Sequence, residues 1–108
     1  DLYAEQFNPV ADFKDFQLTQ NELNTQYFNS QKIAYDQHAL SADINGEIDK
    51  LRQADHLIMQ FPLWWFSAPA ILKGWLDRVL VKGFAYDKGK IFADGLLKGK
   101  TASLTVTT

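Results

Sequence analysis

The order of apolar patterns in the second half of the chain is the feature that most constrains the fold. Residues 56–61 (HLIMQF) form a short apolar run typical of a buried parallel strand, and Pro62, which lacks an amide donor, ends it. Residues 69–82 then carry apolar side chains at helical spacing, and residues 101–108 form a second, β-branched run. A strand, a helix and another strand in this order indicate an α/β fold with a parallel sheet.

A further helix is predicted over residues 42–54, before the first of these strands. Ser41 suits its N-cap, and apolar residues recur at helical spacing at Ile44, Ile48 and Leu51. We expect the carboxylates of this segment to form a solvated helix face: Asp43, Glu47 and Asp49.

The helix over 69–82 has clear start and stop signals. Pro69 suits a first turn, where a missing N–H costs nothing, and Gly83 is expected to close the helix. Its apolar face is broad, and the charged residues between the apolar positions are expected to point away from the core: Lys73, Asp77 and Arg78.

The first 40 residues have a weaker pattern. We interpret Leu2 as part of a strand, whereas the stretch from Glu5 to Leu40 is rich in Asn, Gln and Asp, has irregularly spaced aromatics and offers one helical candidate, residues 30–37. Such a long irregular stretch is uncommon inside a compact domain. Either its aromatics fix a surface excursion to the core, or some of them meet a partner subunit.

Composition excludes several classes of function. With 108 residues the chain has the size of a single domain, and its net charge of −2 with scattered Lys and Arg gives no basic face for nucleic acid or an anionic membrane. No apolar run is long enough for a membrane span. The absence of cysteine excludes thiol catalysis and Cys-ligated zinc, and fits a cytoplasmic protein. Neither metal-ligand spacing nor a Gly-rich phosphate loop occurs.

Ligands of parallel α/β sheets bind beyond the carboxyl ends of the strands. Two stretches fall there, Pro62 to Phe66 and the pair Thr107 and Thr108. The consecutive rings Trp64, Trp65 and Phe66 are unusual in a connection and could form the floor for a planar ligand. Alternatively, they plug the end of the sheet or contact a second chain.

Few other side chains suggest chemistry. Tyr86 is expected on the same side as the crevice, as a core anchor or a lid residue, and the two histidines, His38 and His56, are expected to be structural or solvated. The sequence therefore supplies no nucleophile, general base or metal set. This pattern fits a cofactor that brings its own reactivity.

Three blocks of sequence resemble one known family. QFPLWWFSAPAILKGWLDRVL (60–80), GFAY (83–86) and SLTVTT (103–108) are similar to the flavodoxin-fold NAD(P)H:quinone oxidoreductases, the DT-diaphorase-like family. The resemblance implies a flavodoxin-like three-layer α/β fold with a parallel sheet. It also implies a homodimeric flavoprotein with FAD, or FMN in some relatives, that passes hydride from NAD(P)H through the flavin to a quinone in a ping-pong cycle.

The same resemblance assigns roles to individual residues. Thr107 and Thr108 would begin a second flavin-contacting loop, and Tyr86 would close the pocket from across the dimer. Trp65 and Phe66 would also border the pocket that nicotinamide and quinone share in turn. The loop against the isoalloxazine would comprise Pro62, Leu63, Trp64, Trp65 and Phe66.

The chain also departs from the family pattern. The family's first strand with its phosphate loop would lie before Asp1, and its C-terminal part would lie after Thr108, so we expect residues 1–108 to be the central portion of one incomplete flavodoxin-like domain. Trp64 stands where Gln or Tyr is common. A second hypothesis of another class remains: a flavodoxin-fold ancillary subunit that regulates a potassium-efflux transporter.

Overall fold

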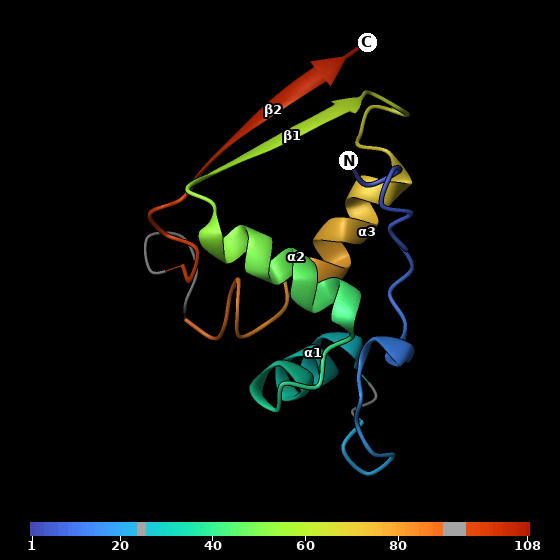
Figure 1. Cartoon of the computed structure of the whole chain (residues 1–108), viewed down its shortest axis with the longest axis vertical. Coiled ribbons are helices and arrows are strands. Elements are labelled where there is room, and N and C mark those ends of the chain that lie inside the picture. Colours follow the sequence, from blue (N-terminus) through green and yellow to red (C-terminus); the bar gives the residue numbers. More distant parts are fainter. Residues whose placement is uncertain (24–25, 90–94) are drawn as a thin grey trace.

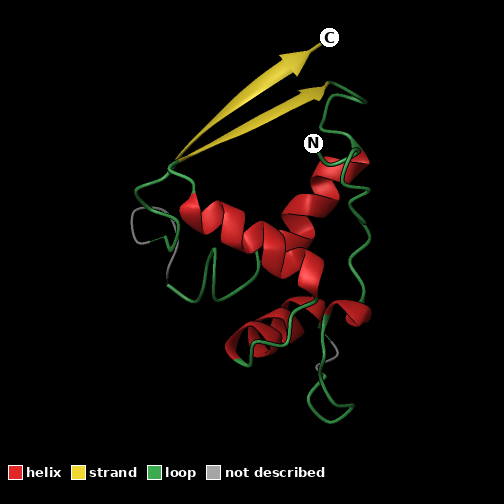
Figure 2. Cartoon of the chain, viewed as in Figure 1, coloured by secondary structure: helices red, strands yellow, loops and turns green. Residues whose placement is uncertain are grey.

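A computed structural model describes residues 1–23, 26–89 and 95–108 (Figure 1). Helices and strands alternate in the second half of the chain, and the helices gather on one side of the strands (Figure 2). In chain order the elements are η1 (Phe13–Asp15), α1 (Tyr27–Asp36), α2 (Ala42–Gln53), β1 (His56–Pro62), α3 (Ala70–Val79) and β2 (Thr101–Thr107).

The two strands form a parallel sheet, as predicted. Their register runs from His56 opposite Thr101 to Pro62 opposite Thr107. Helix α3 lies between them in sequence, so β1, α3 and β2 form a strand–helix–strand crossover of the kind found in α/β folds. The carboxyl ends of both strands therefore meet at one edge of the sheet.

The sheet is less buried than the apolar run predicted. Ile58 and Leu104 are each 63% exposed, and every residue of β2 is exposed. Within the described residues the helices stand on one side of the sheet only (Figure 1), so the other face has no helix layer over it. Within the described residues, the strands therefore lack the cover on both faces that the apolar run predicted.

Helix α2 confirms the prediction for residues 42–54, with Ile44, Ile48 and Leu51 buried in the core. Its cap differs from the expected one. The Ser41 side chain makes no hydrogen bond to the helix backbone; its Oγ donates to Asp43 Oδ1 at 2.6 Å instead. The Ile44 amide, which a capping serine would bind, donates to Asp43 Oδ1 at 2.9 Å instead.

Helix α3 is shorter than predicted. It ends at Val79, because Leu80 leaves the helical region with ψ of 64° and the Val81 amide turns back to the Val79 carbonyl at 2.8 Å. Gly83 does not close the helix. Its φ of +100° instead serves a separate turn, in which its amide donates to the Tyr86 carbonyl at 2.7 Å.

The predicted strand around Leu2 is wrong. Residues 2–6 form turns in which the Phe7 amide donates to the Leu2 carbonyl at 2.9 Å and the Glu5 amide donates to the Asp1 carbonyl at 3.0 Å. These backbone groups pair locally within residues 1–7, so they are not available to a ladder with β1 or β2.

The segment after these turns crosses α3 at Gly74. A Cβ atom at position 74 would lie 2.2 Å from the Pro9 carbonyl oxygen, so only glycine permits this approach.

Phe7 and Phe16 are buried and fix the excursion to the core, as one of the two interpretations held. The predicted helix at 30–37 is confirmed as α1, which begins three residues earlier, at Tyr27. Residues 24–25 of this stretch lie outside the described residues.

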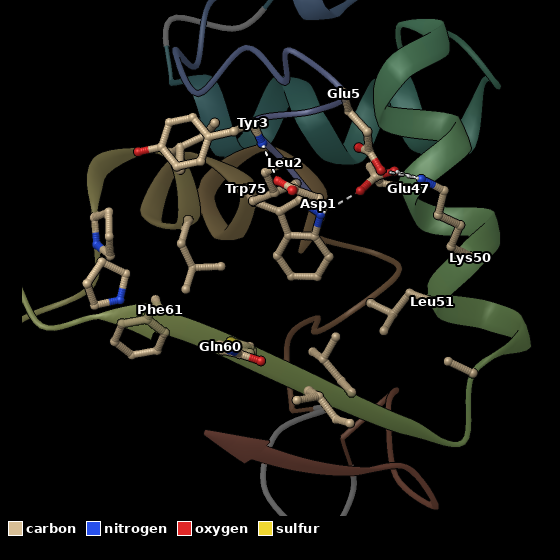
Figure 3. A pocket seen from close by; sticks show the side chains of 18 residues that line it. Asp1, Leu2, Tyr3, Glu5, Glu47, Lys50, Leu51, Gln60, Phe61 and Trp75 are labelled. Carbon is tan, nitrogen blue, oxygen red and sulfur yellow. Dashed lines mark hydrogen bonds and ion pairs between the residues drawn. The ribbon is translucent and has the colours of Figure 1, made fainter. Parts of the chain in front are cut away.

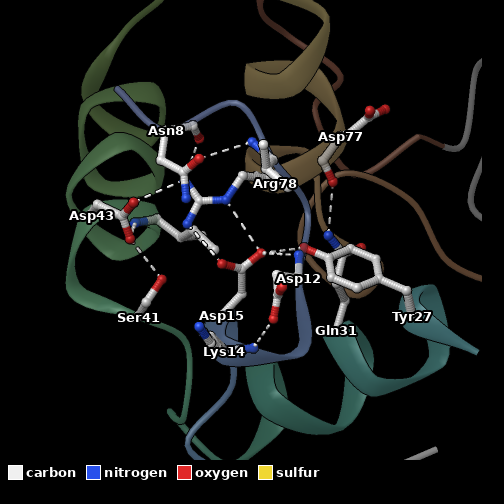
Figure 4. Close-up of polar contacts among 12 residues, drawn as sticks. Asn8, Asp12, Lys14, Asp15, Tyr27, Gln31, Ser41, Asp43, Asp77 and Arg78 are labelled. Carbon is white, nitrogen blue, oxygen red and sulfur yellow. Dashed lines mark hydrogen bonds and ion pairs between the residues drawn. The ribbon is translucent and has the colours of Figure 1, made fainter. Parts of the chain in front are cut away.

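A buried ion cluster joins this segment to the helices (Figure 4). The Arg78 side chain is 2% exposed, and its Nη2 lies 2.8 Å from Asp15 Oδ1 while its Nη1 lies 2.8 Å from Asp43 Oδ2. Arg78 Nη1 also donates to the Asn8 carbonyl at 2.8 Å. Arg78 therefore does not point away from the core, as the helical pattern suggested, because three sequence-distant acceptors satisfy its charge inside the fold.

Glu47 is the second correction on the polar faces. It is only 9% exposed, accepts from Trp75 Nε1 at 3.0 Å and pairs with Lys50 Nζ at 2.6 Å (Figure 3). Three carboxylates were expected on a solvated face of α2. Asp49 is exposed as predicted and pairs with Arg52, whereas Asp43 binds the buried Arg78.

Candidate functional site

The connection after β1 contains a closed two-residue turn. The Trp64 amide donates to the Ser67 carbonyl at 3.0 Å, and the Ser67 amide donates back to the Trp64 carbonyl at 3.0 Å. The two residues between them, Trp65 and Phe66, have φ of 50° and 61°. Positive φ at both central positions is the pattern of a type I′ turn, which normally selects Asn and Gly.

The rings of this turn stand outward. Trp65 is 94% exposed and Phe66 is 91% exposed, whereas Trp64 is 55% exposed. In the described part of the chain, neither of the two central rings therefore plugs the end of the sheet. The arrangement leaves two aromatic side chains open to a ligand or to a second chain.

Backbone donors are also available here. The Leu63 amide donates to the Thr107 carbonyl at 2.8 Å, and the amides of Trp64 and Ser67 close the turn. Among the described residues, no acceptor takes the amide hydrogen of Trp65 or of Phe66. The turn thus combines two open ring systems with two unpaired N–H groups.

The second predicted ligand segment lies beside the first. Pro62 is opposite Thr107 in the sheet register, and the hydrogen bond from Leu63 to Thr107 continues the contact beyond the strand. Thr108 follows directly. The structure therefore brings Pro62, Leu63, Thr107 and Thr108 together at the carboxyl edge of the sheet, with Trp64, Trp65 and Phe66 next to them.

Tyr86 is not part of this group within one chain. It follows Phe84, whose ring centroid lies 6.1 Å from that of Tyr35 and 5.3 Å from the Arg52 guanidinium carbon near the end of α2. That end of α2 adjoins the start of β1, and α3 carries the chain away from the aromatic turn (Figure 1). Within one chain, Tyr86 therefore does not lie on the side of the crevice, contrary to the expectation. Burial, together with the charge of Asp87, raises the pKa of Tyr86.

The histidines lie where the sequence suggested. His56 opens β1, is exposed, and its Nε2 lies 3.0 Å from Ser103 Oγ, at the strand end opposite the aromatic turn. His38 is exposed and occupies a turn after α1 with φ of 56°.

A cavity of about 650 Å³ lies between the first residues, α2, β1 and α3, and it includes Pro62 of the candidate site in its lining (Figure 3). Leu2, Leu51, Leu57 and Trp75 are among its apolar lining, and Glu47 and Lys50 stand at its wall. Trp65 and Phe66 do not line it. The Glu47 carboxylate at its wall is held by Trp75 and Lys50, and the cavity reaches the connection after β1 through Pro62 and Pro69.

Sequence reasoning missed Ser67, which closes the turn, and it missed the left-handed conformation of Trp65 and Phe66. Only the prolines at 62 and 69 mark the ends of the connection in the sequence, since the turn contains neither Gly nor Asn.

Residues 1–23, 26–89 and 95–108 lack the features of two other kinds of site. In those ranges no helix combines the length and apolar character that crossing a membrane requires. They also contain no group of three His, Cys, Asp or Glu residues placed to hold a metal ion.

Comparison with known proteins is consistent with this architecture. Residues 1–108 match the model of a family described by its flavodoxin-like fold. The chain is 50% identical over 111 residues to human ribosyldihydronicotinamide dehydrogenase [quinone], covering 100% of the chain and 47% of that protein. It is 45% identical over 109 residues to rat NAD(P)H dehydrogenase [quinone] 1, covering 100% of the chain and 40% of that protein.

A solved structure is similar as well. A protein from Klebsiella pneumoniae, described as a quinone reductase, superposes with a TM-score of 0.84 at 40% identity, over 98% of this chain and 44% of the other. The chain thus spans about half the length of the relatives it matches. The match to the family model along the whole sequence, together with the parallel α/β architecture, shows that the chain belongs to the family with the flavodoxin-like fold.

Proposed function

We propose that the protein is a flavin-dependent oxidoreductase that transfers hydride from NAD(P)H to quinones. One observation carries the proposal: the turn beyond the carboxyl end of β1 presents two open aromatic rings and two backbone N–H groups that no acceptor among the described residues takes. The relatives reported above, named as quinone dehydrogenases, support the same class of reaction.

The residues present fit a flavin. An isoalloxazine is planar and has a polar edge of carbonyl and nitrogen acceptors, and the turn offers ring faces and N–H donors side by side. FAD is the proposed cofactor, with FMN as the alternative. The residues that would hold it are Pro62, Leu63, Trp64, Trp65, Phe66, Thr107 and Thr108.

When bound, the flavin would supply the hydride chemistry, so the chain's own residues need not react covalently. The N–H groups of Trp65 and Phe66 would stabilise negative charge at the polar edge of the ring system. The two side chains would exclude water and align nicotinamide and quinone in turn at the same place.

The proposal includes a homodimer. Tyr86 lies at the far end of α3 from its own turn, so it can close a pocket only if that pocket belongs to a second copy. We propose that role for Tyr86, and a cytoplasmic location in keeping with the absence of cysteine.

The deciding experiment is the visible absorption spectrum of the purified full-length protein, with chemical identification of the released cofactor. It is followed by quinone reduction assays with NADH, NADPH and ribosyldihydronicotinamide as separate donors, because the relatives' names differ in the donor. A flavin band near stoichiometry and quinone turnover with one donor are expected.

A flavin band with negligible turnover for all donors would contradict the enzyme and favour the ancillary transporter subunit. Absence of a band, also after FAD or FMN is added, would contradict both the cofactor and the reaction.

A further inference from the structure

We propose that the turn closed by Trp64 and Ser67 is held in a strained backbone conformation and forms a preformed platform for the ligand. The free-energy cost of this conformation is then met when the protein folds and not when the ligand binds. The inference rests on the proposed function for the identity of the ligand. It goes beyond that function because it assigns a property to the backbone of the turn, separate from the contacts of the rings.

The strain follows from the backbone angles. Trp65 and Phe66 both lie in the left-handed region, with φ of 50° and 61°. There the Cβ atom crowds the following carbonyl oxygen, and a bulky residue with positive φ is a true outlier. Asn-Gly would form the same two-residue turn at a lower conformational cost.

Nothing in the described chain repays this cost through packing. The two side chains are 94% and 91% exposed, so burial of the rings does not stabilise the turn. The hydrogen bonds around it are those between Trp64 and Ser67 and the one from Leu63 to Thr107. Residues in sparsely populated conformations persist where the surroundings determine them, and they cluster at ligand sites.

The flanking sequence provides such surroundings. Pro62 and Pro69 restrict the backbone at both ends of the connection, and Pro69 is buried with φ of −57°. The connection is thus anchored by β1 on one side and by the first turn of α3 on the other. Together these anchors hold the two rings and their N–H groups in position before any ligand arrives, and a ligand that binds a preformed site loses less free energy to ordering the chain.

The test compares alanine and glycine at the same position. Phe66→Ala and Phe66→Gly both remove the ring, but only glycine relieves the left-handed conformation. In urea unfolding of the full-length protein without flavin, we expect an unfolding equilibrium constant about fivefold larger for Phe66→Ala than for Phe66→Gly. Trp65→Ala and Trp65→Gly form a second pair with the same expected order.

Binding should show the opposite order. Titration with FAD, followed by flavin fluorescence, is expected to give a dissociation constant about threefold larger for Phe66→Gly than for Phe66→Ala, because the glycine turn must be ordered on binding. Trp64 provides the matched control, since it is exposed and adjacent but does not have positive φ. There the glycine variant should be the less stable of the pair.

Equal stability of the alanine and glycine variants at both 65 and 66 would overturn the strain. Equal FAD affinity within each pair would overturn the preformed platform. If the unmodified protein bound neither FAD nor FMN, the proposed function and the binding half of the inference would both fall. The stability comparison would still decide on the strain.

Discussion

The Arg78 guanidinium and the Asp15 carboxylate form a two-pronged ion pair inside the fold, with Nη2 2.8 Å from Oδ1 and Nε 3.2 Å from Oδ2 (Figure 4). Both side chains are almost fully buried, at 2% and 5% exposure. The pair joins α3 to the segment that follows the first turns of the chain. The two parallel hydrogen bonds of such a buried pair offset the loss of water around both charges. Removal of one partner leaves the other charge buried without compensation.

Arg78→Met is therefore expected to lower the free energy of unfolding by about 3–5 kcal/mol, measured by urea denaturation of the full-length protein. Lys73→Met is the control on the same helix, because Lys73 pairs with Asp77 nearer the surface, at 65% and 34% side-chain exposure. It should lose about 1 kcal/mol or less. Similar losses for both variants would show that the buried cluster does not have the role described.

Asp43 makes stability depend on pH. Burial alone would raise the pKa of its carboxyl, but hydrogen bonds from Arg78 and Ser41, the Arg78 charge and the Ile44 amide outweigh burial, so the pKa lies below its usual value. A depressed pKa contributes stability above the unfolded value of about 3.8, and the contribution is lost as pH falls through the folded value.

Unfolding measured from neutral pH down to about pH 3 should show a steeper loss for the natural protein than for Asp43→Asn, which cannot titrate. Parallel curves for Asp43→Asn and the natural protein would contradict the coupling of Asp43 to Arg78.

Gly74 and Gly46 form a natural pair for a test of close packing. A Cβ atom at 74 would lie 2.2 Å from the Pro9 carbonyl oxygen and 2.4 Å from Pro9 Cα, whereas a Cβ atom at 46 meets nothing within 4 Å. Gly74→Ala must displace backbone and should cost at least about 2 kcal/mol of unfolding free energy.

Gly46→Ala, in the interior of α2, should instead add about 0.5–1 kcal/mol, because alanine is the better helix former. Thermal or urea unfolding of the two variants gives the comparison directly. A gain in stability for Gly74→Ala would mean that the first segment does not cross α3 at this point.

Trp65→Ala tests the proposed site. Loss of an exposed ring at the turn should weaken flavin retention or lower quinone turnover by about tenfold, because stacking and ring burial on the ligand are lost. Flavin content and steady-state rates of the full-length protein provide the readout. Leu96→Ala, a change of an exposed apolar residue outside the turn, should leave both unchanged. Natural values for Trp65→Ala would remove Trp65 from the site.

Much of the fold was predictable because local patterns determine it. The periodic apolar residues of α2 and α3 and the β-branched run of β2 predicted these elements to within a few residues, and the two strands predicted the parallel sheet. The carboxyl edge with Pro62 to Phe66 and Thr107 followed from topology alone.

The errors arose where contacts between residues far apart in sequence determine the structure. Arg78 and Glu47 look like surface charges on a helical pattern, and only their partners Asp15 and Trp75, far away in sequence, explain their burial. Leu2 was predicted to belong to a strand, yet its carbonyl accepts from the Phe7 amide in a local turn. The left-handed conformation of Trp65 and Phe66 had no signal, because turn propensity depends on Gly and Asn, which are absent there.

The hydrogen bond from the Leu63 amide to the Thr107 carbonyl has a consequence for engineering. Both groups belong to the backbone, so any residue with an amide hydrogen at position 63 keeps this bond, whereas proline there would remove it. The connection after β1 can therefore be exchanged between relatives while its link to the end of β2 is kept, provided that position 63 retains its amide hydrogen.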